Sequence, residues 1–167
     1  MLSPSGTANL FPYPFVSIRQ MHFIDSEPTL VGRALRLAAL PVLIAMFITP
    51  IRFFLELAGV PTVYVFLIGL LWLSLGFSIY WGVRLSEEEH PYRLLWLSLA
   101  FFSPPSRVPV FLLWWITKTW GLGTHYDIFD SWDQALVGQL FYGALLQIIA
   151  GGILGSLTLA IRRAGTE

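Results

Sequence analysis

Long, almost unbroken apolar stretches dominate the chain. Four of them, at about residues 35–57, 60–83, 92–120 and 135–161, reach or exceed the roughly 20 residues that cross a bilayer. Lipid offers the backbone no hydrogen-bond partners, so each stretch is predicted to be a helix. Runs such as VFLIGLLWLSLGF do not alternate between apolar and polar residues, which argues against a membrane barrel. The pattern predicts an all-α, four-span integral membrane helical bundle.

The flanking sequence divides the rest of the chain. We expect an N-terminal tail over residues 1–32, a four-helix transmembrane domain over residues 33–163 and a short C-terminal tail over residues 164–167. The tail segment NLFPYPFVSIRQMHF is rich in aromatic residues and proline and has no helical period. It is expected either to lie along the inner membrane interface or to dock in a groove of a partner.

Composition strengthens the membrane prediction. Charged residues make up 12% of the 167 residues, whereas a soluble domain carries about 25%. Mean hydropathy is +0.69. The ten basic and ten acidic residues balance, so no net charge attracts a nucleic acid. These values argue against a soluble enzyme and against a nucleic-acid partner, and they make the lipid bilayer the expected environment.

The basic residues are segregated between the two ends of the predicted bundle. One end would hold seven of them: Arg19, Arg33, Arg36, Arg84, Arg93, Arg162 and Arg163. The other end would hold Lys118, while Arg52 and Arg107 fall inside spans. Cytoplasmic loops carry an excess of Lys and Arg, so both termini are predicted to be cytoplasmic.

The third span contains the segment FFSPPSRVPVF, which predicts a break or kink between Ser103 and Pro109. Ser103 followed by Pro104 resembles a helix N-cap followed by proline at the first helical position. A half-helix starting there would present free N–H groups beside Ser103, Ser106 and Arg107 and could bind an anion. The alternatives are a kinked helix with Arg107 bonded to a carbonyl or another helix, and a flanking charge at the inner interface.

Arg52 and Glu56 are four residues apart and share one helix face. One interpretation is an ion pair at the outer interface, with Arg52 extending toward water. The other places both side chains in the bundle as ligand-binding residues that face Arg107.

A stripe of small and amide residues follows one face of the fourth span, at positions four residues apart. Its members are Gln139, Gly143, Gln147, Gly151 and Gly155. Small residues allow close helix packing, and glutamines can hydrogen-bond across the contact. The partner stays open: span one or two, an identical chain or another subunit. On span two, Gly69 with Gly76, or Ser74, Ser78 and Gly82, are possible partners.

The loop before the fourth span contains His125, Asp127 and Asp130, which are weak candidates for a metal site. The favoured interpretation of this loop is a helix cap, with Ser131 and Gln134 as a capping box. The chain has no cysteine, and all three histidines fall outside the spans. This argues against thiolate metal sites and a buried bis-histidine haem, and no cofactor is identified.

These features support three functional hypotheses. The first is a non-catalytic accessory or assembly subunit of a larger membrane complex, in contact with other subunits or with itself. The second is a small transporter or channel that binds an anionic or amphipathic solute at Arg107 and the broken third helix. The third is a lipid-modifying membrane enzyme. It is the least favoured, because a single carboxylate within the spans leaves little acid–base equipment.

Overall fold

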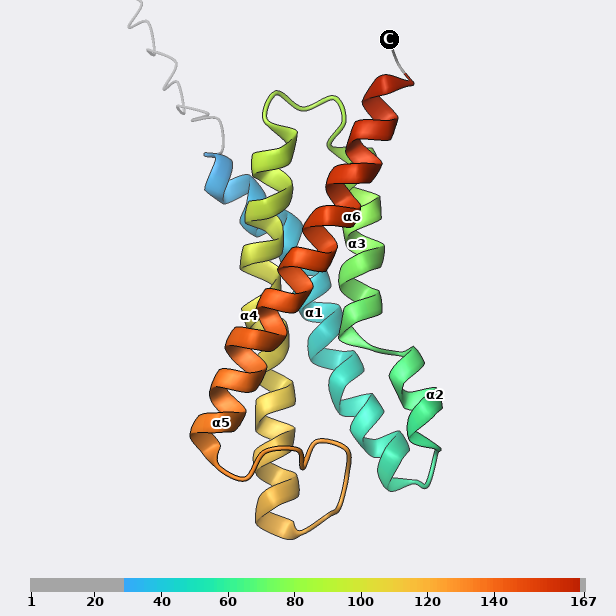
Figure 1. Ribbon diagram of the computed structural model, residues 1–167, viewed down its shortest axis with the longest axis vertical. Helices are drawn as coiled ribbons and strands as arrows, with labels where there is room; N and C mark the ends of the chain where they lie inside the picture. Colours follow the sequence, from blue (N-terminus) through green and yellow to red (C-terminus); the bar gives the residue numbers. More distant parts are fainter. Residues whose placement is uncertain (1–28, 166–167) are drawn as a thin grey trace, which may run out of the picture.

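The computed structural model describes residues 29–165, which form an all-α bundle (Figure 1). Most of the predicted N-terminal tail, including Arg19, lies outside the described residues. Four helical segments are long and apolar enough to span a membrane: Leu30–Leu57, Thr62–Arg84, Pro91–Trp120 and Trp132–Ala164. The predicted four-span architecture is therefore confirmed.

The first span is a single helix, α1 (Leu30–Leu57), and the third is a single helix, α4 (Pro91–Trp120). The second span is divided into α2 (Thr62–Leu67) and α3 (Leu70–Arg84). The fourth contains α5 (Trp132–Leu136), a π-helix η1 (Val137–Gly143) and α6 (Ala144–Ala164). The start of α1 and the end of α6 lie at the same end of the bundle (Figure 1).

The prediction of a break in the third span is wrong. Helix α4 is continuous through Pro104, Pro105 and Pro109, so no second N-terminus forms at Ser103. The prolines withdraw three backbone donors, but α4 is the most buried of the four spans and neighbouring helices hold it in place. Its buried hydroxyls also bond to backbone carbonyls, as Ser106 Oγ does to Ser103 O at 2.7 Å.

The break lies instead in the second span, at Ile68 and Gly69. Ile68 ends α2 and the extended residue Gly69 precedes α3. The two helices diverge at this point (Figure 1). The carbonyl oxygen of Val65, at the end of α2, accepts a hydrogen bond from Arg52 Nε at 3.0 Å. A side chain of α1 thus stabilises the interruption.

Small and hydroxyl residues lie inside the bundle together with large apolar side chains such as Trp81 and Phe102, and further large apolar side chains cover the outside. Helix α1 packs on α4, and α3 packs on α6. The buried residues include alanines of α1 and serines of α3 and α4, whereas Phe47 is 70% exposed. An exposed surface this rich in large apolar side chains is unlike that of a soluble protein and suits contact with lipid.

The stripe on the fourth span packs within the chain. A Cβ on Gly155 would lie 2.9 Å from Ser78 O, and one on Gly151 would lie 2.6 Å from Ser78 Oγ. On α3, a Cβ on Gly82 would lie 2.7 Å from Gly155 O. The partner is therefore the face of α3 formed by Ser74, Ser78 and Gly82, which brings two backbones into direct contact.

Candidate functional site

A cavity of about 430 Å³ lies toward the end of the bundle that carries the α4–α5 connection. Arg52 from α1 and Arg107 from α4 both line it, together with residues of α2, α3, η1 and α6. The cavity wall also contains His125, Tyr126, Ile128 and Phe129 of the connection. Two of the three charged side chains that the sequence places within spans therefore line the same cavity.

Arg52 is almost completely buried, with 6% of its surface exposed. Its Nε donates to Val65 O, and its guanidinium carbon lies 5.9 Å from the centre of the Phe66 ring. No hydrogen bond within residues 29–165 involves its two terminal nitrogens, so these donors are available to a ligand.

Arg107 lies near the midpoint of α4 and is held by the two glutamines of the stripe. Its Nε donates to Gln147 Oε1 at 3.1 Å, and Nη1 donates to Gln139 Oε1 at 3.5 Å. Gln147 is fully buried and also donates through Nε2 to Leu70 O at 3.1 Å. It therefore connects Arg107 to the first residue of α3.

The π-helix brings the stripe to Arg107. Gln139 and Gly143 lie within η1, and a Cβ on Gly143 would lie 3.1 Å from the guanidinium carbon of Arg107. The absence of a side chain at Gly143 lets the guanidinium lie against the helix. π-Helical turns occur frequently at functional sites. The stripe thus has two roles: Gln139, Gly143 and Gln147 contact Arg107, whereas Gly151 and Gly155 contact α3 and α4.

Neither arginine has an acidic partner in the part of the chain that the structure describes. Four ion pairs occur within the described part of the chain, and none includes Arg52 or Arg107. The two guanidiniums also repel each other electrostatically. A buried charge without a partner is costly, and a charge inside a membrane is a functional candidate by default. The cavity therefore carries positive charge that no acidic residue between positions 29 and 165 neutralises through an ion pair.

The expected pairing of Arg52 with Glu56 does not form. Glu56 instead accepts a hydrogen bond from the backbone N–H of His125 at 2.6 Å, and its second oxygen pairs with His125 Nδ1. Glu56 therefore faces the α4–α5 connection and ties it to α1. It does not line the cavity.

Further contacts hold this connection over the cavity. Trp114 Nε1 donates to Phe129 O at 3.1 Å, and Thr117 Oγ1 lies 2.8 Å from Thr124 Oγ1. The Tyr126 hydroxyl donates to Thr49 O at 3.4 Å, and burial raises the pKa of this tyrosine to about 12. The connection is a fixed wall of the cavity.

The weak metal candidates are not brought together. His125 pairs with Glu56, and Asp127 accepts from Lys118 Nζ at 3.1 Å. Across residues 29–165 no three His, Asp or Glu side chains are grouped as metal ligands. Ser131 occupies the N-cap position of α5, but its side chain makes no capping hydrogen bond, so the predicted capping box is wrong.

Ser103 and Ser106 do not line the cavity. Ser106 bonds within α4 and reaches Gln147 Oε1 at 3.4 Å, and the buried Ser103 hydroxyl has no hydrogen-bond partner within residues 29–165. The sequence reasoning missed the apolar wall formed by Phe66, Leu70 and Leu71. Gly69, in the middle of an apolar run, was the signal that could have located this part of the site.

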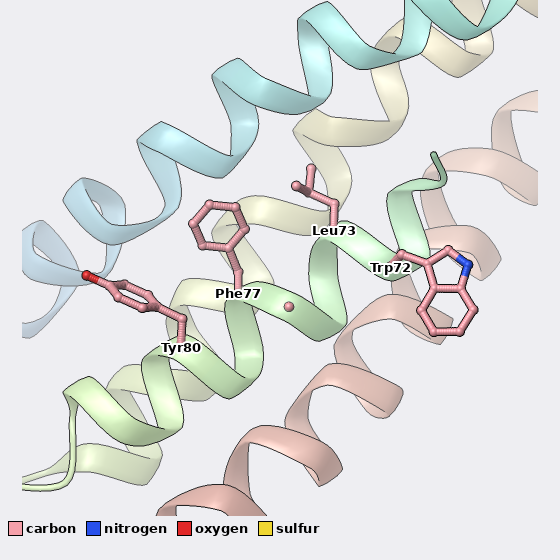
Figure 2. A pocket seen from close by; sticks show the side chains of 5 residues that line it. Trp72, Leu73, Phe77 and Tyr80 are labelled. Carbon is pink, nitrogen blue, oxygen red and sulfur yellow. The ribbon is translucent and has the colours of Figure 1, made fainter. Parts of the chain in front are cut away.

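A second hollow, of about 290 Å³, lies along α3 (Figure 2). Its lining is Trp72, Leu73, Gly76, Phe77 and Tyr80. Leu73 and Phe77 extend on the side of α1, while Trp72 points the other way (Figure 2). The lining has no charged side chain, so this hollow resembles lipid-facing surface more than a site.

Comparison of the sequence with models of known protein families, with curated proteins and with solved structures found no match.

Proposed function

We propose that this chain is a small membrane transporter or channel that binds an anionic or amphipathic solute in the cavity between Arg52 and Arg107. One observation carries the proposal: two arginines from different helices line the same cavity, and neither has a carboxylate partner among the described residues. An anion entering the cavity would supply the missing counter-charge and relieve the repulsion between the guanidiniums.

The proposed orientation follows from the surrounding charge. The bundle end at which α1 starts and α6 ends carries Arg33, Arg36, Arg84, Arg93, Arg162 and Arg163. This excess supports a cytoplasmic position for that end. The cavity and the α4–α5 connection then lie toward the opposite, outer side of the membrane.

The test is thermal unfolding of the purified protein in a non-ionic detergent, with and without inorganic phosphate or dodecyl phosphate. A ligand at about 100 times its Kd adds about 2.7 kcal/mol, which raises the Tm by about 5 °C or more. Arg107→Gln should remove this increment. Arg84→Gln, an exposed change at the other end of the bundle, should retain it. An increment that survives Arg107→Gln would contradict the proposal.

A lipid-modifying enzyme is the second candidate function, and one contact favours it. His125 lines the cavity and its ring is paired with Glu56. A histidine oriented by a carboxylate is a common general base. The expected result is release of a product from phospholipid vesicles by the wild-type protein and not by His125→Gln. No release by the wild type would rule this candidate out for the lipids used.

The alternative of an accessory or assembly subunit is no longer supported by the stripe, although its other arguments remain. Gly151 and Gly155 are occupied by α3 and α4 of the same chain, and Gln139 and Gln147 are bonded to Arg107. A partner subunit would have to use a different surface.

A further inference from the structure

The start of α3 adds backbone donors to the cavity. The N–H groups of Leu70 and Leu71 belong to the first turn of a 15-residue helix and have no backbone acceptor within the described residues. Both leucines line the cavity. Free N–H groups at a helix start, together with the helix dipole, favour an anion. At membrane depth such donors are costly without an acceptor.

Arg52 is the independent observation that points to a ligand at this helix start. It is more than nine-tenths buried, it lines the same cavity, and its two terminal nitrogens have no hydrogen-bond partner among residues 29–165. Arg107 contributes Nη2, which is also without a partner there. Three guanidinium nitrogens and two backbone amides without partners among residues 29–165 thus belong to residues that line one cavity. Several donors converging from different directions suit the oxygens of a phosphate group.

The mouth of the cavity is apolar. Four of its lining residues are exposed at the surface of the bundle: Phe66, Leu71, Ile128 and Leu146. In a bilayer, exposed apolar side chains on spanning helices, here Phe66, Leu71 and Leu146, face acyl chains. A ligand that fits both parts of the cavity has an anionic group at one end and hydrocarbon at the other.

We infer that the cavity binds an anionic phospholipid, with its phosphate group between Arg52, Arg107 and the start of α3, and its acyl chains leaving past Leu71 and Leu146. This inference rests on the proposed anion-binding function and specifies its ligand. The cavity volume of about 430 Å³ falls within the range typical of small-molecule sites, about 300–1,000 Å³. The recognised chemistry is a phosphate group, which free inorganic phosphate also carries.

The experiment is native mass spectrometry of the detergent-solubilised full chain with three lipids of identical acyl chains: phosphatidic acid, phosphatidylcholine and diacylglycerol. Phosphatidic acid should bind about tenfold more tightly than diacylglycerol, which has no phosphate to accept charge-assisted hydrogen bonds. It should also bind about tenfold more tightly than phosphatidylcholine, whose choline cation cancels the net charge of its phosphate. Arg52→Gln and Arg107→Gln should abolish this preference, whereas Arg84→Gln should retain it.

A second variant keeps the test valid if loss of a buried arginine impairs folding. Leu146→Trp enlarges an exposed side chain at the cavity mouth and leaves both guanidiniums in place. It should weaken phosphatidic acid binding about tenfold, while stabilisation by inorganic phosphate is unchanged.

The possible outcomes separate this inference from the proposed function. Equal binding of diacylglycerol would overturn the inference, because the cavity would then hold only hydrocarbon. Stabilisation by inorganic phosphate as strong as by phosphatidic acid, and unaffected by Leu146→Trp, would identify a soluble anion; the lipid inference would fail while the anion site stood. If neither Arg52→Gln nor Arg107→Gln weakens the binding of any of the phosphate compounds, both proposals fail.

Discussion

At the scale of single residues, Gln147 joins the parts of the site. Its amide oxygen accepts from Arg107 Nε and Ser106 Oγ, and its amide nitrogen donates to Leu70 O. All of these contacts are long-range in sequence and fully or partly buried. Because a buried polar group without a partner is costly, each member of this network stabilises the positions of the others.

We therefore predict that Gln147→Leu destabilises the protein by about 1–3 kcal/mol, because it leaves Arg107 Nε without its acceptor. The measurement is the free energy of unfolding in mixed micelles. The matched control is Gln134→Leu, an exposed glutamine on the same span, which should change stability by less than about 0.5 kcal/mol. Equal effects of the two variants would show that the network adds no stability.

At the scale of the helices, the irregular segments form the site. The break between α2 and α3 supplies helix-start donors, and η1 brings Gln139 and Gly143 to Arg107. Helix α4, with three prolines, remains regular. The two irregularities lie in different spans, and both contribute to the lining of one cavity.

Gly143 provides a test of the π-helix. A side chain at this position would collide with the Arg107 guanidinium, at 3.1 Å from an added Cβ. We predict that Gly143→Leu displaces Arg107 and removes the thermal stabilisation by dodecyl phosphate. Gly76→Leu is the matched control, because nothing lies within 4 Å of an added Cβ at that helical glycine, and it should keep the stabilisation. Retained stabilisation in Gly143→Leu would mean that the close approach of Arg107 is not needed for binding.

The sequence predicted the helices better than their interruptions, for a physical reason. Hydrophobic length is a local property, so the four spans and the charges within them could be recognised from the chain alone. Whether a helix breaks depends on its neighbours: the prolines of α4 are tolerated inside the bundle, whereas Gly69 breaks the second span where Arg52 can bond Val65 O. The pairing of Glu56 with His125 joins residues far apart in sequence, and no local pattern predicts it.

At the scale of the whole molecule, the two ends of the bundle differ in charge. The end with the start of α1 and the end of α6 is rich in arginine, whereas the connection near the cavity contains Asp127 and Asp130. Because this asymmetry predicts the orientation of the bundle, it also predicts which leaflet of the membrane lies next to the cavity. If the arginine-rich end is cytoplasmic, the phosphate site is nearer the outer leaflet.

Cysteine labelling tests this orientation, because the chain has no cysteine of its own. Glu87→Cys lies in the α3–α4 turn and Asp130→Cys in the α4–α5 connection; both replace an exposed acidic residue. In intact cells, a membrane-impermeant maleimide should label only Asp130→Cys, and after permeabilisation it should label both. The reverse pattern would place the cavity on the cytoplasmic side, and an anionic lipid would then have to reach it from the inner leaflet. The arginine-rich end would in that case violate the usual excess of positive charge inside, so the labelling result decides both the topology and the leaflet that supplies the ligand.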